Sequence, residues 1–200
     1  VNIEDISIGM GLDNRIGSRF LRAGPAYGGS CFPKDTKAIT STADIFKINL
    51  SLIKSVIKSN ENRSLILSKR VFDLLKGKIK NKKICFLGIT FKANTDDMRD
   101  SSCLSMIPSL IKKGAKINYY DPTGEKKEFK KMNNVLFSPD IKSAIRNADL
   151  IIIHTEWNDF KSINFKKEVK NKNFIIFDMR NIYSKYKMEK LGVKYFGVGK

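Results

Sequence analysis

The chain is poor in cysteine and histidine and has no long apolar run. Its three cysteines, Cys31, Cys85 and Cys103, are odd in number and widely separated. This argues against a disulfide framework and a Cys-x-x-Cys metal site, and favours a reducing compartment. Apolar runs such as 150–153 are strand-sized, whereas a membrane-spanning helix needs roughly 20 apolar residues. We therefore expect a cytoplasmic protein without a metal site or a membrane partner.

A secretory leader is not visible, and the chain begins with Val1 rather than Met. This start is typical of a fragment, so we expect that an upstream segment has been left out of the chain.

Acidic residues are also scarce, with 20 Asp and Glu against 38 Lys and Arg, which gives a formal net charge of +18. Nucleic-acid-binding proteins often cluster their basic residues and use arginine for bidentate contacts. Here only 8 of the 38 basic residues are arginine, and the lysines are scattered along the chain, often as pairs such as Lys82-Lys83. We favour a solvated, lysine-rich surface over a nucleic-acid interface, and expect the charge to assist the capture of a small anionic molecule.

Residues 1–76 have helical periodicity. A short apolar helix over 3–10 is followed by a glycine-rich loop, by a helix over 33–46, and by apolar residues at helical spacing over 50–75. The last of these helices would be about 25 residues and roughly 37 Å long. Such a length predicts a helix that connects domains or supports a dimer interface.

After Gly77 the periodicity changes to short apolar strands. They are expected at 84–87, 117–120, 150–153, 174–177 and 193–196, with helices over 103–113 and 141–147 between some of them. Strands that alternate with helices indicate a parallel sheet covered on both faces. The sequence therefore predicts an α/β fold, with a helical central segment (1–76) that carries one long helix, followed by a Rossmann-like parallel-sheet domain (77–200).

Polar residues follow the predicted strands, where ligands bind in such sheets. The dinucleotide fingerprint Gly-x-Gly-x-x-Gly is absent, because only Gly88 follows the first strand, and the Gly9-x-Gly11 pair follows no strand. Asp121, after the second strand, resembles a ribose-binding acid by position alone. We expect this domain to bind a nucleotide, but not NAD in the usual way.

The segment 28–35, Gly-Gly-Ser-Cys-Phe-Pro-Lys-Asp, is a plausible setting for a reactive thiol. If a helix begins near Pro33, its N–H groups and dipole, together with the charge of Lys34, favour the thiolate form of Cys31. Asp35 follows four residues later and can share the same side of the first turn. On spacing alone, a small buried cysteine beside a turn remains an equally good interpretation.

Several motifs, in order along the chain, resemble the UDP-glucose 6-dehydrogenases of the UDP-glucose/GDP-mannose dehydrogenase family. They cover essentially the whole chain and lie at 13–17, 28–35, 91–92, 95–99, 155–157 and 180–181. Enzymes of this family have an N-terminal NAD-binding domain, a long central helix and a C-terminal UDP-binding Rossmann-like domain. The resemblance implies that this chain corresponds to the last two parts, that the main NAD site lies upstream, and that the protein forms a homodimer through the long helix.

The resemblance also implies a reaction for Cys31. The family oxidises the sugar C6 alcohol to a carboxylate in two hydride transfers to NAD, and the cysteine forms a thiohemiacetal and then a thioester with the substrate. Asp35 would position or activate the hydrolytic water, the alternative being an ion pair with Lys34. Lys34 and Arg99 match residues that contact NAD.

The remaining site residues implied by the resemblance bind UDP-glucose. They are Arg15, Phe20, Leu21, Arg22, Tyr27, Gly28, Phe32, Phe91, Lys92 and Arg180. Arg15 matches an arginine that reaches the neighbouring subunit's site, and Lys92 and Arg180 form a cationic pair suited to a diphosphate. Met179 stands where the family has a glycine.

Two other functions stay open. The chain could serve a dehydrogenase of another sugar nucleotide, such as GDP-mannose, or be a non-catalytic basic module that binds nucleic acid or a protein. For His154, Cys85, Cys103 and Trp157 we expect structural roles.

Overall fold

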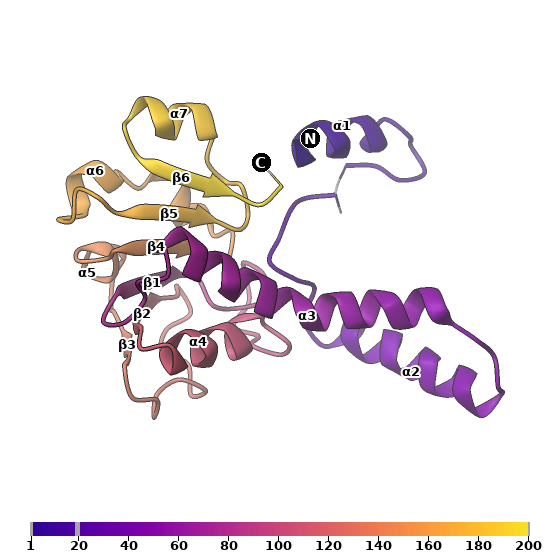
Figure 1. Ribbon diagram of the computed structural model, residues 1–200. Coiled ribbons are helices and arrows are strands. Elements are labelled where there is room, and N and C mark those ends of the chain that lie inside the picture. The colour runs from indigo at the N-terminus through magenta and orange to yellow at the C-terminus, as the bar shows by residue number, and fades with distance from the viewer. Residues whose placement is uncertain (1, 19–20, 200) are drawn as a thin grey trace.

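The computed structural model describes residues 2–18 and 21–199 and is built around a six-stranded parallel sheet (Figure 1). The strand order is β3-β2-β1-β4-β5-β6, and all neighbouring pairs are parallel. This is the order of a dinucleotide-binding fold, in which the topological switch point lies between the first and fourth strands. The strands are β1 (Lys83–Leu87), β2 (Lys116–Tyr120), β3 (Val135–Phe137), β4 (Leu150–Ile153), β5 (Ile175–Asp178) and β6 (Lys194–Gly197).

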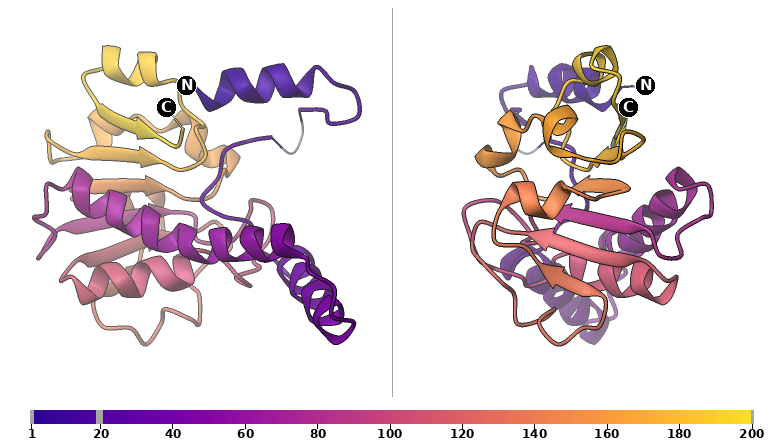
Figure 2. Two further views of the ribbon diagram at one scale, coloured as in Figure 1. Left: turned by 45° about the vertical axis from the view of Figure 1, so that its right-hand side comes forward. Right: turned by 90° about the vertical axis from the view of Figure 1, so that its left-hand side faces the viewer.

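Helices cover both faces of the sheet because alternate strand residues point to opposite sides. In β1, Ile84 and Phe86 face the core that is closed by α3 (Ser51–Leu74) and α4 (Cys103–Lys112). Cys85 and Leu87 face the second core, closed by shorter helices on the other side (Figure 2). These are α5 (Ile141–Ile145), the 3-10 helix η1 (Asn158–Ser162), α6 (Phe165–Glu168) and α7 (Lys185–Lys190).

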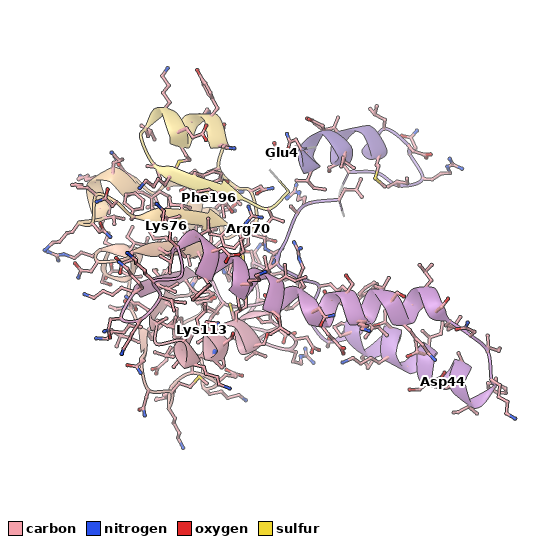
Figure 3. All side chains as sticks on the ribbon, in the orientation of Figure 1. Glu4, Asp44, Arg70, Lys76, Lys113 and Phe196 are labelled. Carbon is pink, nitrogen blue, oxygen red and sulfur yellow. The ribbon has the colours of Figure 1, made fainter. Side chains whose placement is uncertain are left out.

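The first part of the chain extends beyond the sheet. Helix α1 (Ile3–Gly11) is tied to the end of β6, where Ile3 N donates to Gly199 O at 2.9 Å. Helix α2 (Cys31–Ile45) and the first half of α3 form a hairpin that projects away from the sheet (Figures 1 and 2). Near the far end of this hairpin, Lys54 Nζ pairs with Asp44 Oδ1 at 2.5 Å (Figure 3).

The long helix α3 connects the two parts. Its buried residues, Ser64, Leu67, Ser68 and Val71, all belong to its second half, which packs on the sheet. Arg70 lies over the Phe177 ring at 5.1 Å from the centroid. The expected long helix is confirmed, whereas its role between domains and the division into 1–76 and 77–200 remain predictions.

The expected α/β architecture, the long helix and the five expected strands are confirmed to within one or two residues at their ends. Strand β3 was not expected, because it has only three residues and lies at the sheet edge with Leu136 65% exposed. Helix α2 begins at Cys31, two residues before the expected Pro33. No helix within 2–18 and 21–199 is long and apolar enough to cross a bilayer.

Candidate functional site

Three loops meet at the carboxyl ends of the central strands, next to the switch point. They follow β1 (88–102), β4 (154–157) and β5 (179–184). The β1 and β4 loops are in close contact, because a Cβ on Gly88 would lie 2.5 Å from Thr155 Cβ. This crevice is where open α/β sheets bind ligands.

The segment that precedes Cys31 is clamped onto α3 by two side chains. Asn60 Oδ1 accepts from Tyr27 N and Asn60 Nδ2 donates to Tyr27 O, both at 3.0 Å. Arg63 Nε donates to Pro25 O at 3.1 Å. All three bonds satisfy main-chain groups of a segment without regular structure, so an ordered loop leads to the cysteine.

The glycine pair in this segment rests directly on the β1 loop. Gly29 N donates to Arg99 O at 2.8 Å, and Gly29 has φ +84° with the Phe91 ring only 2.7 Å from where its Cβ would be. A Cβ on Gly28 would lie 2.6 Å from Asp100 O. Glycine is therefore required here for close packing and, at Gly29, for the left-handed conformation.

Cys31 is the first residue of α2 and is exposed, while the other two cysteines are buried. Ser30 Oγ lies 3.7 Å from its sulfur. The Arg99 guanidinium is nearby: its pKa is raised mainly by the hydrogen bond to Asp97, with a smaller contribution from Cys31. The position at a helix N-terminus agrees with the sequence expectation, and the alternative of a buried cysteine is wrong.

The two charged residues after the cysteine pair with each other. Lys34 Nζ lies 3.4 Å from Asp35 Oδ1, and the two side chains are 73% and 66% exposed. An ion pair this exposed contributes little stability, so both groups remain available. The roles of Lys34, Asp35 and Arg99 in the reaction remain predictions.

Arg180 is held inside the crevice rather than on the surface. Its side chain is 14% exposed and lies 2.9 Å from Glu156 Oε2, and it donates to His154 O at 2.9 Å and to Phe91 O at 2.7 Å. Burial is the main reason that its pKa is lowered. The preceding Met179 is buried in the core.

Lys92 is exposed, with its Nζ 5.3 Å from the Phe91 ring centroid. Because much of the Arg180 guanidinium is already bonded within the protein, Lys92 is the more available cation of this pair.

A pocket of about 310 Å³ opens beside Arg180. It is enclosed by α1, by the start of the cysteine segment, including Leu21 and Arg22, and by the loops after β4 and β5. Glu4 of α1 lies at its wall (Figure 3). The pocket therefore joins three parts of the chain that are far apart in sequence.

Other expected site residues lie at the edge of this arrangement or outside the described residues. Tyr27 and Phe32 contact each other edge to face, with centroids 4.7 Å apart, and Phe32 is 55% exposed. Arg15, in the turn after α1, is 89% exposed and pairs with Asp13 at 2.6 Å. Phe20 lies outside the described residues.

Sequence reasoning missed the residues that hold the loops in place. Asn60 and Arg63 belong to a stretch of α3 that already contains several polar residues, so the sequence carried no distinct signal for this role. Asp121, considered as a ribose ligand, is buried and accepts from Ile89 N and Thr123 N. Within the described part of the chain, no cluster of three or more His, Cys, Asp or Glu residues could hold a metal.

Two family models match the chain. Residues 1–62 match the central domain, and residues 85–185 the UDP binding domain, of the UDP-glucose/GDP-mannose dehydrogenase family.

Curated relatives match over the whole chain. A UDP-glucose 6-dehydrogenase of Rhizobium meliloti is 40% identical over 200 residues, which is 100% of this chain and 46% of the relative. The UDP-glucose 6-dehydrogenase YwqF of Bacillus subtilis is 37% identical over 100% of this chain and 46% of its own length. The chain thus spans about half the length of these relatives.

The fold is also found in solved structures. A UDP-glucose dehydrogenase from Pyrobaculum islandicum superposes with a TM-score of 0.83 and 28% identity, over 100% of this chain and 44% of that one. An NDP-N-acetyl-D-galactosaminuronic acid dehydrogenase from Methanosarcina mazei has the same TM-score and coverage at 23% identity, which shows the fold alone.

Proposed function

The chain belongs to the UDP-glucose/GDP-mannose dehydrogenase family, and we propose that it forms the central and UDP-binding parts of an NAD-dependent UDP-glucose 6-dehydrogenase of the cytoplasm. The observation that carries this proposal is the exposed Cys31 at the start of α2, on a loop docked against the crevice of the sheet. Relatives named UDP-glucose 6-dehydrogenase support the choice of substrate.

In this proposal Cys31 is the nucleophile. Its sulfur adds to the C6 carbonyl carbon of the intermediate aldehyde, and the carbonyl oxygen takes up a proton to give a thiohemiacetal. Loss of hydride from C6 and of the hydroxyl proton converts this adduct to a thioester, and water then displaces the Cys31 thiolate to release the carboxylate. Asp35, one turn further along α2, would orient that water.

NAD, when bound, supplies the two hydride acceptors. The described residues could supply only outlying contacts to NAD, because the turn after β1 carries Gly88 without the remaining glycines of a dinucleotide fingerprint. The side chains of Lys34 and Arg99 are exposed and would contribute contacts. We therefore assign the main NAD site to a segment outside these 200 residues.

The substrate would lie between the cysteine segment and the crevice. Lys92 and the remaining donors of Arg180 would bind the diphosphate, because guanidinium and ammonium groups suit phosphate oxygens. The segment from Leu21 to Gly28, with Arg22 and Tyr27, would cover the nucleotide together with Phe20. Phe32 and Phe91 would line the part of the site that holds the sugar.

The projecting hairpin is the proposed dimer interface. Its exposed apolar residues include Ile39, Ile45, Phe46, Leu52 and Val56. Exposed apolar patches of this kind mark interaction sites. A dimer through the hairpin would let Arg15 of one subunit reach the site of the other.

Titration calorimetry of the 200-residue chain tests the nucleotide specificity. We expect UDP-glucose to bind more tightly than GDP-mannose, and Lys92→Gln to weaken UDP-glucose binding without loss of the fold. Stronger binding of GDP-mannose would favour a related dehydrogenase. Tightest binding to duplex DNA with a steep salt dependence would refute the enzyme proposal.

A further inference from the structure

His154 is the single histidine of the chain and lies fully buried at the end of β4. Its Nε2 is 2.8 Å from Ser102 Oγ and its Nδ1 is 3.2 Å from Thr155 Oγ1. Burial and the Arg180 charge lower its pKa to about 3, so the ring is neutral at physiological pH. A neutral imidazole carries one proton, which makes one nitrogen a donor and the other an acceptor.

The partners decide which nitrogen carries that proton. Thr155 has one hydroxyl hydrogen, which it donates to the carbonyl oxygen of Thr90 at 2.8 Å. Toward His154 it can therefore only accept, so Nδ1 must be the donor. Nε2 is then unprotonated and accepts the hydroxyl hydrogen of Ser102. The result is a chain of hydrogen bonds with a single direction, from Ser102 through His154 and Thr155 to Thr90.

One end of this series of hydrogen bonds is Ser102, in the loop against which Gly28 and Gly29 pack. Ser102 is the N-cap of α4, yet its hydroxyl makes no capping bond to the helix, although serine is favoured at this position for that bond. The hydroxyl is committed to His154 instead. The residues just before Ser102 contact the cysteine segment, through Arg99 O to Gly29 N and through Asp100 O against Gly28.

The other end of this series of hydrogen bonds is Thr90, next to Phe91 in the same loop after β1. Thr90, whose carbonyl accepts from Thr155, uses its own hydroxyl to donate to Lys92 O at 3.0 Å. These two bonds fix the main chain on both sides of Phe91, whose ring packs against Gly29. The main chain at the same position contacts Arg180, because the backbone carbonyl of His154 accepts from Arg180 Nε.

We propose that His154 is a positioning residue, which locks the loops 89–92 and 97–102 together and thereby holds the Gly28-Gly29 approach that places Cys31. The consequence for the reaction rests on the proposed function, in which Cys31 is the reacting group. The mechanical part, an ordered approach loop that depends on the imidazole, stands independently of it.

The tautomer can be tested in the unaltered 200-residue chain. With ¹⁵N-labelled histidine, the chain should show one pair of ring signals, with a protonated Nδ1 and an unprotonated Nε2, unchanged between pH 5.5 and 8.5. A protonated Nε2, or a ring that titrates in this range, would overturn the proposal.

Amide hydrogen exchange tests the mechanical link. In His154→Leu and in the milder Ser102→Ala, the Gly29 amide should exchange about tenfold faster or more, because a buried partner is left unsatisfied. His154→Gln, whose amide oxygen can accept from Ser102, should restore part of the protection.

Ser138→Ala is the matched control. Ser138 is also buried and donates to Asn118 Oδ1 at 2.8 Å, but it follows the edge strand β3. Equal effects of His154→Leu and Ser138→Ala on Gly29 would show that His154 is an ordinary core residue. A chain that fails to bind UDP-glucose but shows the expected exchange pattern would refute the proposed function and leave this inference intact.

Discussion

Replacing Gly29 with alanine separates two costs that coincide at this residue. The left-handed conformation, φ +84°, costs an L-residue about 1–2 kcal/mol. The new methyl group would also lie 2.7 Å from the Phe91 ring, and overpacking of this kind costs about 1–3 kcal/mol more. We therefore expect Gly29→Ala to lower the free energy of unfolding by about 2–5 kcal/mol in urea denaturation.

Gly124 provides the control for the conformational part. It has φ +87°, and nothing lies within 4 Å of where its Cβ would be, so Gly124→Ala should cost only about 1–2 kcal/mol. The entropy lost by the unfolded chain is the same for both substitutions and cancels in the comparison. Adding Phe91→Ala to Gly29→Ala should recover the steric part. Equal losses at the two glycines, or no recovery in the double variant, would refute the claimed contact with Phe91.

Three further predictions concern charge and accessibility. Iodoacetamide should label Cys31 alone in the folded chain, because burial raises the pKa of the other two thiols. Detection of a second labelled cysteine by mass spectrometry would contradict the structure. Between pH 8 and pH 5, His154 should lower the free energy of unfolding by about 2 kcal/mol, because its imidazole takes up a proton near pH 6.5 in the unfolded chain but only near pH 3 in the folded chain. Denaturation curves of His154→Gln should lack this part of the pH dependence. Arg180→Met should lower the free energy of unfolding by about 1.5–3 kcal/mol, because it leaves Glu156 and two carbonyls without their charged partner. Lys92→Gln should change it by less than about 0.5 kcal/mol, so similar unfolding curves for the two variants would contradict the difference in burial.

The helices and central strands could be predicted because their periodicity is strong. Strand β4 is fully buried and apolar throughout, β1 is buried and apolar after Lys83, and α3 has apolar residues at helical spacing over 24 residues. Strand β3 has no such signal, because three residues at a sheet edge show little alternation. The beginning of α2 was displaced by two residues because proline is favoured in the first helical turn without marking which residue of that turn it occupies.

The candidate site was predicted less completely than the fold. Motif resemblance assigned the residues around Cys31 and the pair Lys92 and Arg180, because each of them belongs to a short contiguous motif. The clamp by Asn60 and Arg63 joins segments more than 30 residues apart, and no local pattern relates them. The direction of the hydrogen bonds around His154 depends on three loops together, so it becomes visible only in the fold.

The sheet of this domain has the strand order of a dinucleotide-binding fold, but the turn after its first strand makes different contacts. Where such a fold turns its first main-chain N–H groups toward a pyrophosphate, here Ile89 N donates to the Asp121 carboxylate at 2.9 Å. The first main-chain N–H after Gly88 is thus satisfied within the fold by an acidic side chain. The helix after β1 then begins only at Cys103, and the intervening loop contacts the cysteine segment through the Phe91 ring and through Arg99 O, which accepts from Gly29 N. Because Ile89 N is bonded within the fold, the glycines that let a pyrophosphate approach this turn in a dinucleotide-binding fold would serve no purpose here, and the loop supports the segment that leads to Cys31.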